Sequence, residues 1–494
     1  AVNLVFNPSG YAPIPLVYKD VGRIRLYGAL TVPASGNNPA LTVTGSSNEF
    51  ISKPADLVVS VASNPATTAS GSGFITASTN FNVGVQARNS LGGTTPNFGQ
   101  ESSAETAKVA LVALTYPTGG SNAGTLTSGS YSLSGSTDGA GTVVASFNEV
   151  GTITLRAEIG DGDYLGVGNV TGTTSGNIGR FYPNQFVLSS DGVIDACTPG
   201  TDFTYMDAPN LAIAYTITAK NAAGATVTHY DTSDGYAVAS IAAVAEATTN
   251  NGTNLSSRLT HATTSWNAGI YTINDTTAKF ARGSNPEAEL DLDIGLTLTD
   301  SLDGRNFSSL DMNAGTSGNC ASDSSCNSLD LTGNPKLRWG RLALNSASGS
   351  ETQALGVPLL TQYYNGSSFI TNTDDGCTTI ARSKIEFNDG AINTAANLTI
   401  DIGSGSNNST GSSSNVNLSS ADLVVVSGDG NLSFSAPSDG DRGSFTVDID
   451  LTNLPWLKYD WDLDGSHDDS PPGVTGTFGI YGGHSKILFR RESN

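Results

Sequence analysis

Carboxylates alternate with apolar side chains in the segment YDWDLDGSHDD, residues 459–469. In an extended backbone, side chains two residues apart point the same way, so Asp460, Asp462 and Asp464 share one face. If Asp460 is position one, these carboxylates stand at positions 1, 3 and 5, and Gly465 provides a sharp turn at position 6. This order of oxygen ligands and glycine is typical of an EF-hand-type calcium loop.

The rest of the segment follows that pattern only in part. Asp468 supplies an oxygen at position 9, but position 12, where a bidentate Glu is usual, is Pro471. The flanking residues are strand-like, so a helix–loop–helix is not expected. The alternative interpretation is the solvated end of a strand in an acidic protein. The predicted calcium ligands are Asp460, Asp462, Asp464 and Asp468.

Two other acidic turns are weaker calcium candidates. Asp161 and Asp163 flank a glycine directly after a predicted strand, and Asp300 and Asp303 precede Gly304. Asp-Gly is also the ordinary chemistry of a hairpin turn, so a plain turn is the competing interpretation at both places.

The four cysteines indicate disulfides rather than a metal centre. None forms a C-x-x-C pair, and the four histidines are scattered, so a zinc site is not expected. Cys320 and Cys326 lie in one short polar loop, which favours a local disulfide. Cys197 and Cys377 occupy similar contexts, DACT and DGCT, and are assigned to each other, although four cysteines allow three connectivities. An even cysteine count favours an oxidising compartment outside the cytoplasm.

Composition limits the class of partner. Lys and Arg total 23 against 45 Asp and Glu, for a formal charge of −22 over 494 residues. This balance argues against nucleic acid and anionic membranes as partners, because their phosphates attract basic side chains.

No apolar run approaches twenty residues, so no membrane insertion is predicted. Catalytic signatures such as G-x-S-x-G, a P-loop or H-E-x-x-H do not occur, and we predict that the chain is not an enzyme.

Strict alternation of apolar and polar residues predicts antiparallel strands with one buried face. It is clearest in GTITLRAEI at 151–159, LDLDIGLTLT at 290–299 and FTVDIDL at 445–451. Short strands between Gly, Asn and Asp clusters favour sandwiches of the immunoglobulin type. The expected fold is therefore all-β, with tandem immunoglobulin-like sandwiches and a distinct C-terminal β domain.

The chain also repeats itself with a period of about 130 residues, the size of a domain. Three pairs of segments share this offset: YKDVGRIRL at 18–26 with FNEVGTITL at 147–155, SNEF at 47–50 with PNQF at 183–186, and ARNSLGGTTPNF at 87–98 with AKNAAGATVTHY at 219–230. The register predicts a half unit at 1–50, full units at 51–186 and 187–334, and the C-terminal domain at 335–494. A polar stretch at 403–420 is expected to be a long surface loop.

A half sandwich leaves its apolar face and strand edges open. Completion of residues 1–50 by strand addition from another copy or from a pilus component would build a head-to-tail filament. Completion by upstream residues of a longer chain is the alternative, and the two are equally compatible with the sequence.

Several strings resemble the MshQ-like family, whose members are encoded with the mannose-sensitive haemagglutinin (MSHA) type IV pilus. These strings are FNEVGTITLRA at 147–157, GRFYPNQF at 179–186, the segment 337–380, PWLKYDWDLDG at 455–465 and TFGIYGGHSKILFRRE at 477–492. The resemblance implies an exported protein of Gram-negative bacteria at the cell surface, associated with pilus-type structures and adhesion. It carries over no catalytic residues.

Three functions compete at this point. The expected one is a structural extracellular protein, part of a pilus-linked or self-assembled filament that calcium and disulfides stiffen. The second is an adhesin or carbohydrate-binding protein on a β-sandwich stalk, with surface glycans as partners and Trp339, Trp456 and Trp461 as possible stacking platforms. The third, a secreted hydrolase, lacks a recognisable catalytic set.

Overall fold

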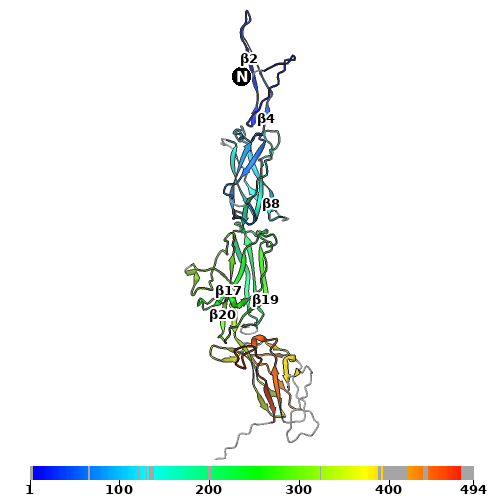
Figure 1. Ribbon diagram of the computed structural model, residues 1–494, viewed down its shortest axis with the longest axis vertical. Helices are drawn as coiled ribbons and strands as arrows, with labels where there is room; N and C mark the ends of the chain where they lie inside the picture. The colour runs from blue at the N-terminus through cyan, green and yellow to red at the C-terminus, as the bar shows by residue number, and fades with distance from the viewer. Residues whose placement is uncertain are drawn as a thin grey trace, which may run out of the picture.

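The computed structural model shows an elongated chain of β domains placed end to end (Figure 1). It describes residues 4–64, 67–118, 123–129, 131–132, 138–198, 202–322, 324–387, 391–392, 421–437 and 443–479. The predicted loop at 403–420 lies outside these residues. Within them, strands dominate, and the helical elements are the short 3₁₀ turns η1 (Ser256–Arg258), η2 (Cys320–Ser322), η3 (Arg382–Lys384) and η4 (Pro455–Leu457). The predicted all-β, tandem-sandwich fold is therefore confirmed.

The first complete sandwich has two facing sheets, ordered β10-β8-β12-β13-β6 and β5-β7-β11-β9. The predicted alternation in β12 is visible as burial, since Ile153, Leu155, Ala157 and Ile159 are all inaccessible to solvent. The strands are β5 (Asp56–Ser60), β6 (Ile75–Thr76), β7 (Asn80–Arg88), β8 (Thr106–Tyr116), β9 (Leu126–Ser128), β10 (Tyr131–Ser132), β11 (Ala140–Phe147), β12 (Gly151–Ile159) and β13 (Ile178–Tyr182).

The next sandwich pairs the sheets β14-β16-β19-β18 and β15-β22-β20-β17, with β21 added beside β20. In β16 every second residue is buried, as an antiparallel strand with one core face requires. The strands are β14 (Gln185–Ile194), β15 (Thr204–Tyr205), β16 (Leu211–Lys220), β17 (Ser240–Ala247), β18 (Leu259–Thr260), β19 (Ile270–Phe280), β20 (Leu290–Thr299), β21 (Leu329–Asp330) and β22 (Lys336–Arg338).

The C-terminal domain has a sheet β24-β34-β33-β29-β30, a sheet β23-β26-β27 and the pairs β25-β32 and β28-β31. The strands are β23 (Gly340–Leu344), β24 (Ala347–Gly349), β25 (Leu355–Gly356), β26 (Leu359–Tyr364), β27 (Phe369–Thr371), β28 (Thr379–Ile380), β29 (Ile385–Phe387), β30 (Ala391–Ile392), β31 (Leu423–Val424), β32 (Ser433–Phe434), β33 (Gly443–Ile449) and β34 (Val474–Phe478). Among the described residues no helix has the length and apolar character needed to cross a bilayer.

The N-terminal unit forms two antiparallel pairs, β1 (Gly22–Ile24) with β4 (Phe50–Ser52) and β2 (Tyr27–Val32) with β3 (Leu41–Ser46). Every residue of β2 and β3 is exposed, and the hairpin projects beyond the first sandwich (Figure 1). By the sequence repeat, β2 corresponds to the second part of β12, which in its own sandwich pairs with β8. No strand among the described residues covers β2 in this way.

Candidate functional site

The joints between domains repeat along the chain, and a carboxylate closes each of the first two. Glu149 precedes β12, and its Oε1 accepts hydrogen bonds from the backbone N–H and hydroxyl of Thr228, at 2.9 and 2.8 Å. Its Oε2 accepts from the backbone N–H of His229 at 3.2 Å. At the preceding joint, Asp20 occupies the equivalent position and accepts from the backbone N–H of Asn97 at 3.1 Å. Each carboxylate therefore caps a turn that belongs to the following domain.

An asparagine on that following domain returns the contact. The side-chain amide of Asn221 donates to the backbone carbonyl of Asn148 at 2.9 Å. Asn89, its equivalent one repeat earlier, donates to the carbonyl of Lys19 at 2.7 Å. The Oδ1 of each asparagine also closes its own turn by accepting two backbone N–H groups. One side chain thus shapes a turn and binds the neighbouring domain.

A valine completes each of the first two joints. Val21 lies in the apolar core of the first sandwich and Val150 in that of the second, and both are inaccessible to solvent or nearly so. Each is contributed by the preceding unit, so neighbouring domains share core residues. The repeated strings that indicate a duplication, DVG and EVG with ARN and AKN, are the residues of the joint.

Asn221→Ala is expected to destabilise the second sandwich by about 1–3 kcal/mol, because it removes a buried donor and the acceptor of a turn. Differential scanning calorimetry of the full chain measures this loss. Asn365→Ala is the matched control, since the Asn365 Oδ1 closes an exposed turn within its own domain in the same way. Equal losses for both variants would show that the joint contributes nothing beyond its turn.

The joint between the two complete sandwiches also contains a buried ion pair. The guanidinium of Arg180, on β13, binds the Oδ1 of Asp303, and both side chains are about 1% exposed. Arg180 also donates through Nε to the carbonyl of Gly71 at 2.6 Å. Arg305 donates to the Tyr182 hydroxyl at 3.1 Å and so joins the same two domains.

The weaker predicted calcium ligands take part in this ion pair and in turns. Asp303 is neutralised by an arginine of the preceding domain, and Asp300 accepts the backbone N–H groups of Leu302 and Asp303 at 3.2 and 3.1 Å. Asp161 and Asp163 likewise accept backbone N–H groups within their own turn. Turn closure and ion pairing are therefore the contacts that the structure shows for these four carboxylates.

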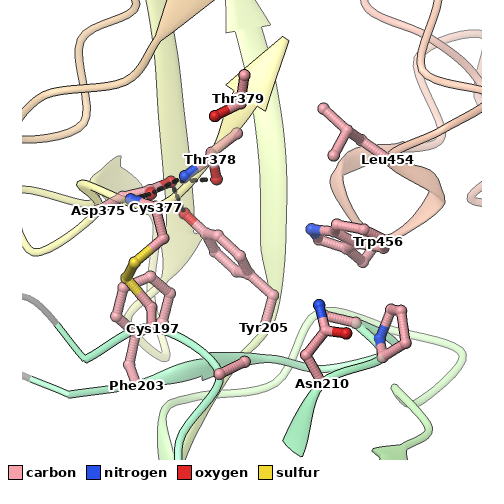
Figure 2. A pocket seen from close by; sticks show the side chains of 13 residues that line it. Cys197, Phe203, Tyr205, Asn210, Asp375, Cys377, Thr378, Thr379, Leu454 and Trp456 are labelled. Atoms are coloured by element: carbon pink, nitrogen blue, oxygen red, sulfur yellow. Dashed lines mark hydrogen bonds between the residues drawn. A yellow bond between two sulfur atoms is a disulfide. The ribbon is translucent and has the colours of Figure 1, made fainter. Parts of the chain in front are cut away.

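The last joint is covalent. Cys197 is bonded to Cys377, with their Cα atoms 5.7 Å apart, and the bond connects the segment after β14 to the C-terminal domain (Figure 2). Phe203, Tyr205 and Ala208, from the same segment, lie in the apolar core of the C-terminal domain. The predicted boundary at 334/335 is therefore not a clean division, because part of 187–334 packs inside its neighbour.

A buried polar contact lies beside this disulfide. The Tyr205 hydroxyl donates to the Oδ2 of Asp375 at 3.0 Å and accepts from the amide of Asn372 at 2.8 Å. Burial, and then the charge of Asp375, raise the pKa of Tyr205, so the phenol stays protonated and acts as a donor. Next to it is a cavity of about 140 Å³ with Trp456 on its wall (Figure 2).

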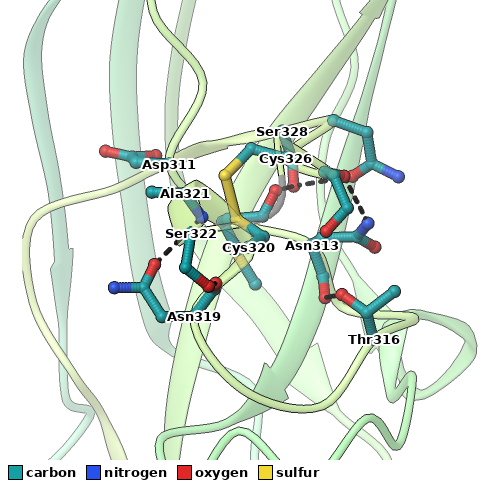
Figure 3. Close-up of a disulfide and its surroundings, with 12 residues drawn as sticks. Asp311, Asn313, Thr316, Asn319, Cys320, Ala321, Ser322, Cys326 and Ser328 are labelled. Atoms are coloured by element: carbon teal, nitrogen blue, oxygen red, sulfur yellow. Dashed lines mark hydrogen bonds between the residues drawn. A yellow bond between two sulfur atoms is a disulfide. The ribbon is translucent and has the colours of Figure 1, made fainter.

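The second disulfide is local and has the predicted pairing. Cys320 and Cys326 are six residues apart and close a polar loop between β20 and β21 (Figure 3). Asn319 accepts the backbone N–H of Ala321 at 3.0 Å within that loop. Both predicted disulfides are thus present, and they differ in role, one within a domain and one between domains.

The Asp-rich loop is also part of the last joint. Arg282, just after β19, donates to the backbone carbonyls of Lys458 and His467 at 2.9 and 2.6 Å. The Nε2 of His467 lies 2.9 Å from the carbonyl of Ser284. The His467 ring packs against Trp339, which joins the two domains, at a centroid distance of 4.9 Å. The loop is therefore held against the preceding sandwich at both of its ends.

The loop brings together a different set of acids from the predicted one. Carboxylate oxygens of Asp460, Asp462 and Asp469 all lie within 4.8 Å of one another. Asp464 and Asp468 are not in this group. Asp464 instead accepts the backbone N–H of Ser466 at 2.8 Å, which closes the turn. Asp469 is the ligand candidate that sequence reasoning missed.

The electrostatics of the group fit a hard cation. The Asp464 backbone N–H lowers the pKa of Asp462, but desolvation and the charges of Asp464, Asp469 and Asp460 outweigh it, so the pKa is raised overall. The Oδ1 of Asp460 is buried and has no hydrogen-bond partner among the described residues. Converging carboxylates with a free buried oxygen are what calcium prefers as ligands.

Three successive parts of the chain match domains of one known protein family. Residues 53–144, 149–327 and 338–493 match the second, third and fourth domains of DUF6701 in that sequence. The chain belongs to the DUF6701 family. The second DUF6701 domain ends within β11 and the third begins at the joint carboxylate Glu149, just before β12, whereas the first complete sandwich continues to Tyr182.

Solved structures match this DUF6701 chain at low sequence identity. The Escherichia coli adhesin FdeC is 12% identical, with a TM-score of 0.36, and the match covers 86% of this chain and 99% of that one. Invasin, a bacterial integrin-binding protein, is 9% identical, with a TM-score of 0.29, and the match covers 96% of this chain and 74% of that one. No curated protein matches the chain.

Proposed function

We propose that this chain is a structural protein of the bacterial cell surface, a stiff extracellular stalk that forms part of a pilus-linked or self-assembled filament. The observation that carries the proposal is that every joint between domains is closed by specific contacts. Carboxylate caps and shared valines close the first two joints, and a disulfide closes the last. Domains connected by flexible linkers move independently, whereas shared core residues oppose bending.

Other features support a location outside the cytoplasm and a pilus-linked partner. Disulfides persist in oxidising compartments, which supports a place outside the cytoplasm. The resemblance to the MshQ-like family supports a connection with the type IV pilus of Gram-negative bacteria. The absence of a recognisable catalytic set supports a role that is not enzymatic.

The exposed hairpin β2–β3 is the proposed contact for assembly. Its apolar side chains, such as Tyr27, Leu30 and Val43, are more than half exposed. A strand from another copy or from a pilus component would complete the sheet as β8 completes the sheet of β12. Completion by a preceding segment of a longer chain remains the alternative.

Electron microscopy of the purified native material, with and without EDTA, tests this proposal. Filaments with an axial repeat of one chain support assembly through residues 1–50. Dispersed, straight rods support a stalk without self-assembly. Rods that bend freely at the joints contradict the stalk itself.

We also propose that the group Asp460, Asp462 and Asp469 binds calcium, which would stiffen the last joint. EDTA is then expected to lower the melting temperature of the C-terminal domain, and Asp462→Ala or Asp469→Ala to abolish that sensitivity. Asp468→Ala is the matched control, since this carboxylate lies outside the group. Thermal unfolding that is the same with EDTA and with calcium rules the site out.

The second candidate is an adhesin or carbohydrate-binding protein on a β-sandwich stalk. The cavity beside the Cys197–Cys377 disulfide favours it, because Trp456 and Asn210 offer an aromatic face and an amide to a sugar. Trp339 is buried in the joint, so it is not available for stacking. A glycan array that gives a hit lost in Trp456→Ala would promote this function over the structural one.

A further inference from the structure

A stripe of carboxylates runs along one face of β20 in the second complete sandwich. Glu289 and Asp291 each have a cation, because the Nζ of Lys336 lies 3.0 and 3.1 Å from their oxygens. Arg338 binds Glu289 as well, at 2.7 Å. Asp293, next on the same face, forms no ion pair within the described part of the chain. The stripe therefore continues beyond its neutralising cations.

Two neighbouring strands add carboxylates at that point. Glu246 on β17 lies directly opposite Asp293, and Asp330 on β21 lies opposite Gly295, two residues further along β20. Residues opposite each other in antiparallel strands share a face, and so do residues two apart. Glu246, Asp293 and Asp330 thus converge on one face of the sheet.

The loop that covers this face brings a fourth carboxylate. Asp311 accepts the backbone N–H of Asp330 at 2.8 Å. It lies on the segment that leads into the loop closed by Cys320 and Cys326 (Figure 3). The disulfide therefore restrains the covering segment above the acidic face.

Two of these carboxylates, Glu246 and Asp330, have a buried oxygen without a partner, while Asp293 accepts the side-chain amide of Asn334. Glu246 is 3% exposed, and its Oε2 is buried without a hydrogen-bond partner in the described structure. The Oδ1 of Asp330 is also buried and unpartnered. Desolvation, and then the charges of Asp293 and Asp311, raise the pKa of Asp330 to about 7. A buried carboxylate without a partner is costly, and several together repel one another.

We propose that Glu246, Asp293 and Asp330, with Asp311 at the edge, form a second divalent-cation site, and that its ion is calcium. The donor set consists of carboxylate oxygens without His or Cys, which favours a hard cation over zinc. Among the described residues these oxygens do not form a group as close as that of Asp460, so binding requires the side chains to move toward the ion. The affinity is therefore expected in the range of extracellular modules, about 10⁻⁴ to 10⁻³ M. Binding would join β17, β20 and β21 to the loop above them.

Calcium titration of the full chain by isothermal calorimetry tests the proposal. The Asp462→Asn background removes binding by the Asp-rich loop, so this inference is tested separately from that site. We expect one calcium per chain in Asp462→Asn and none when Asp330→Asn is added. Asp291→Asn is the matched control, because it alters the same stripe where a lysine already neutralises it, and it should leave the stoichiometry unchanged.

A second readout distinguishes a ligand from a structural residue. In the absence of calcium, Asp330→Asn is expected to raise the melting temperature, because it removes a repelling charge. In the presence of calcium, the same variant is expected to bind no ion. Glu246→Gln should give the same two results and replaces Asp330→Asn if that variant does not fold. No calcium bound in Asp462→Asn, or binding that both substitutions leave intact, overturns the proposal.

Discussion

Removing the Cys197–Cys377 disulfide is expected to lengthen the chain under tension by about 600 Å, the extended length of the segment that the bond bypasses. The two cysteines are 180 residues apart in sequence. A force applied at the chain ends passes through the sulfur atoms, so the backbone between them carries none of it. That backbone includes β15 to β22, most of a complete sandwich, and β23 to β27 of the C-terminal domain, which therefore cannot be pulled open while the disulfide is intact.

Single-molecule force spectroscopy measures this length directly. Cys197→Ser/Cys377→Ser should add the full increment to the total contour length, whereas Cys320→Ser/Cys326→Ser should add nothing, because residues 320–326 lie inside the segment that the intact Cys197–Cys377 bond bypasses. Equal contour lengths for the native chain and the first variant would show that the interdomain bond does not form. Closing a loop of this size also stabilises a fold by about 5 kcal/mol in the chain-entropy description. The first variant should therefore also melt at a lower temperature.

Alternation in the sequence was sufficient to predict the strands, and it was not sufficient to predict which surfaces the joints cover. In β12 the apolar set is buried as expected, but Thr152 and Thr154 are buried too. Tyr116 and Leu114 pair with this end of the strand, and the next sandwich lies close to it. A polar residue that a neighbouring domain covers has the same sequence pattern as one in water, so periodicity cannot distinguish them.

In the Asp-rich loop, too, the residue pattern did not determine which side chains come together. Spacing alone selected Asp468 as a ligand, but the loop reverses through Leu463 and Gly465, which have φ values of 62° and 93°. The return strand then places Asp469 opposite Tyr459. This pairing turns Asp469 toward Asp460 and leaves Asp468 outside. The choice between adjacent carboxylates depends on the backbone path of the turn, which the order of residue types does not determine.

The sequence repeat marks the positions of the joints, but it does not show which contacts close them. The repeat of DVG as EVG, at an offset of about 130 residues, marks positions that two domains share. In the structure, Asp20 and Glu149 cap turns of the next domain, a contact that the repeat alone does not reveal. The interdomain role of the Cys197–Cys377 bond was equally hidden, because a predicted pairing does not say which domain each cysteine packs against.

Arg180→Met is expected to destabilise the two complete sandwiches by about 3–5 kcal/mol, because it leaves the Asp303 carboxylate buried without a counter-charge. Differential scanning calorimetry of the full chain should show lower melting temperatures and looser coupling between the two transitions. Lys108→Met is the matched control. Lys108 pairs with Glu158 at 3.3 Å, but its side chain is 42% exposed, and such pairs contribute only about 0–1 kcal/mol.

The double variant Arg180→Met/Asp303→Leu separates the strength of this joint from its specificity. Replacing both members of a buried ion pair by apolar groups is often neutral or stabilising, so most of the lost stability should return. The Nε contact of Arg180 with Gly71 is not restored, since methionine cannot donate to that carbonyl. A double variant that is stable but bends more freely in small-angle scattering would assign the ion pair to domain orientation. A double variant as unstable as Arg180→Met would assign the loss to the Gly71 contact and to packing, and would contradict the unpaired charge as its cause.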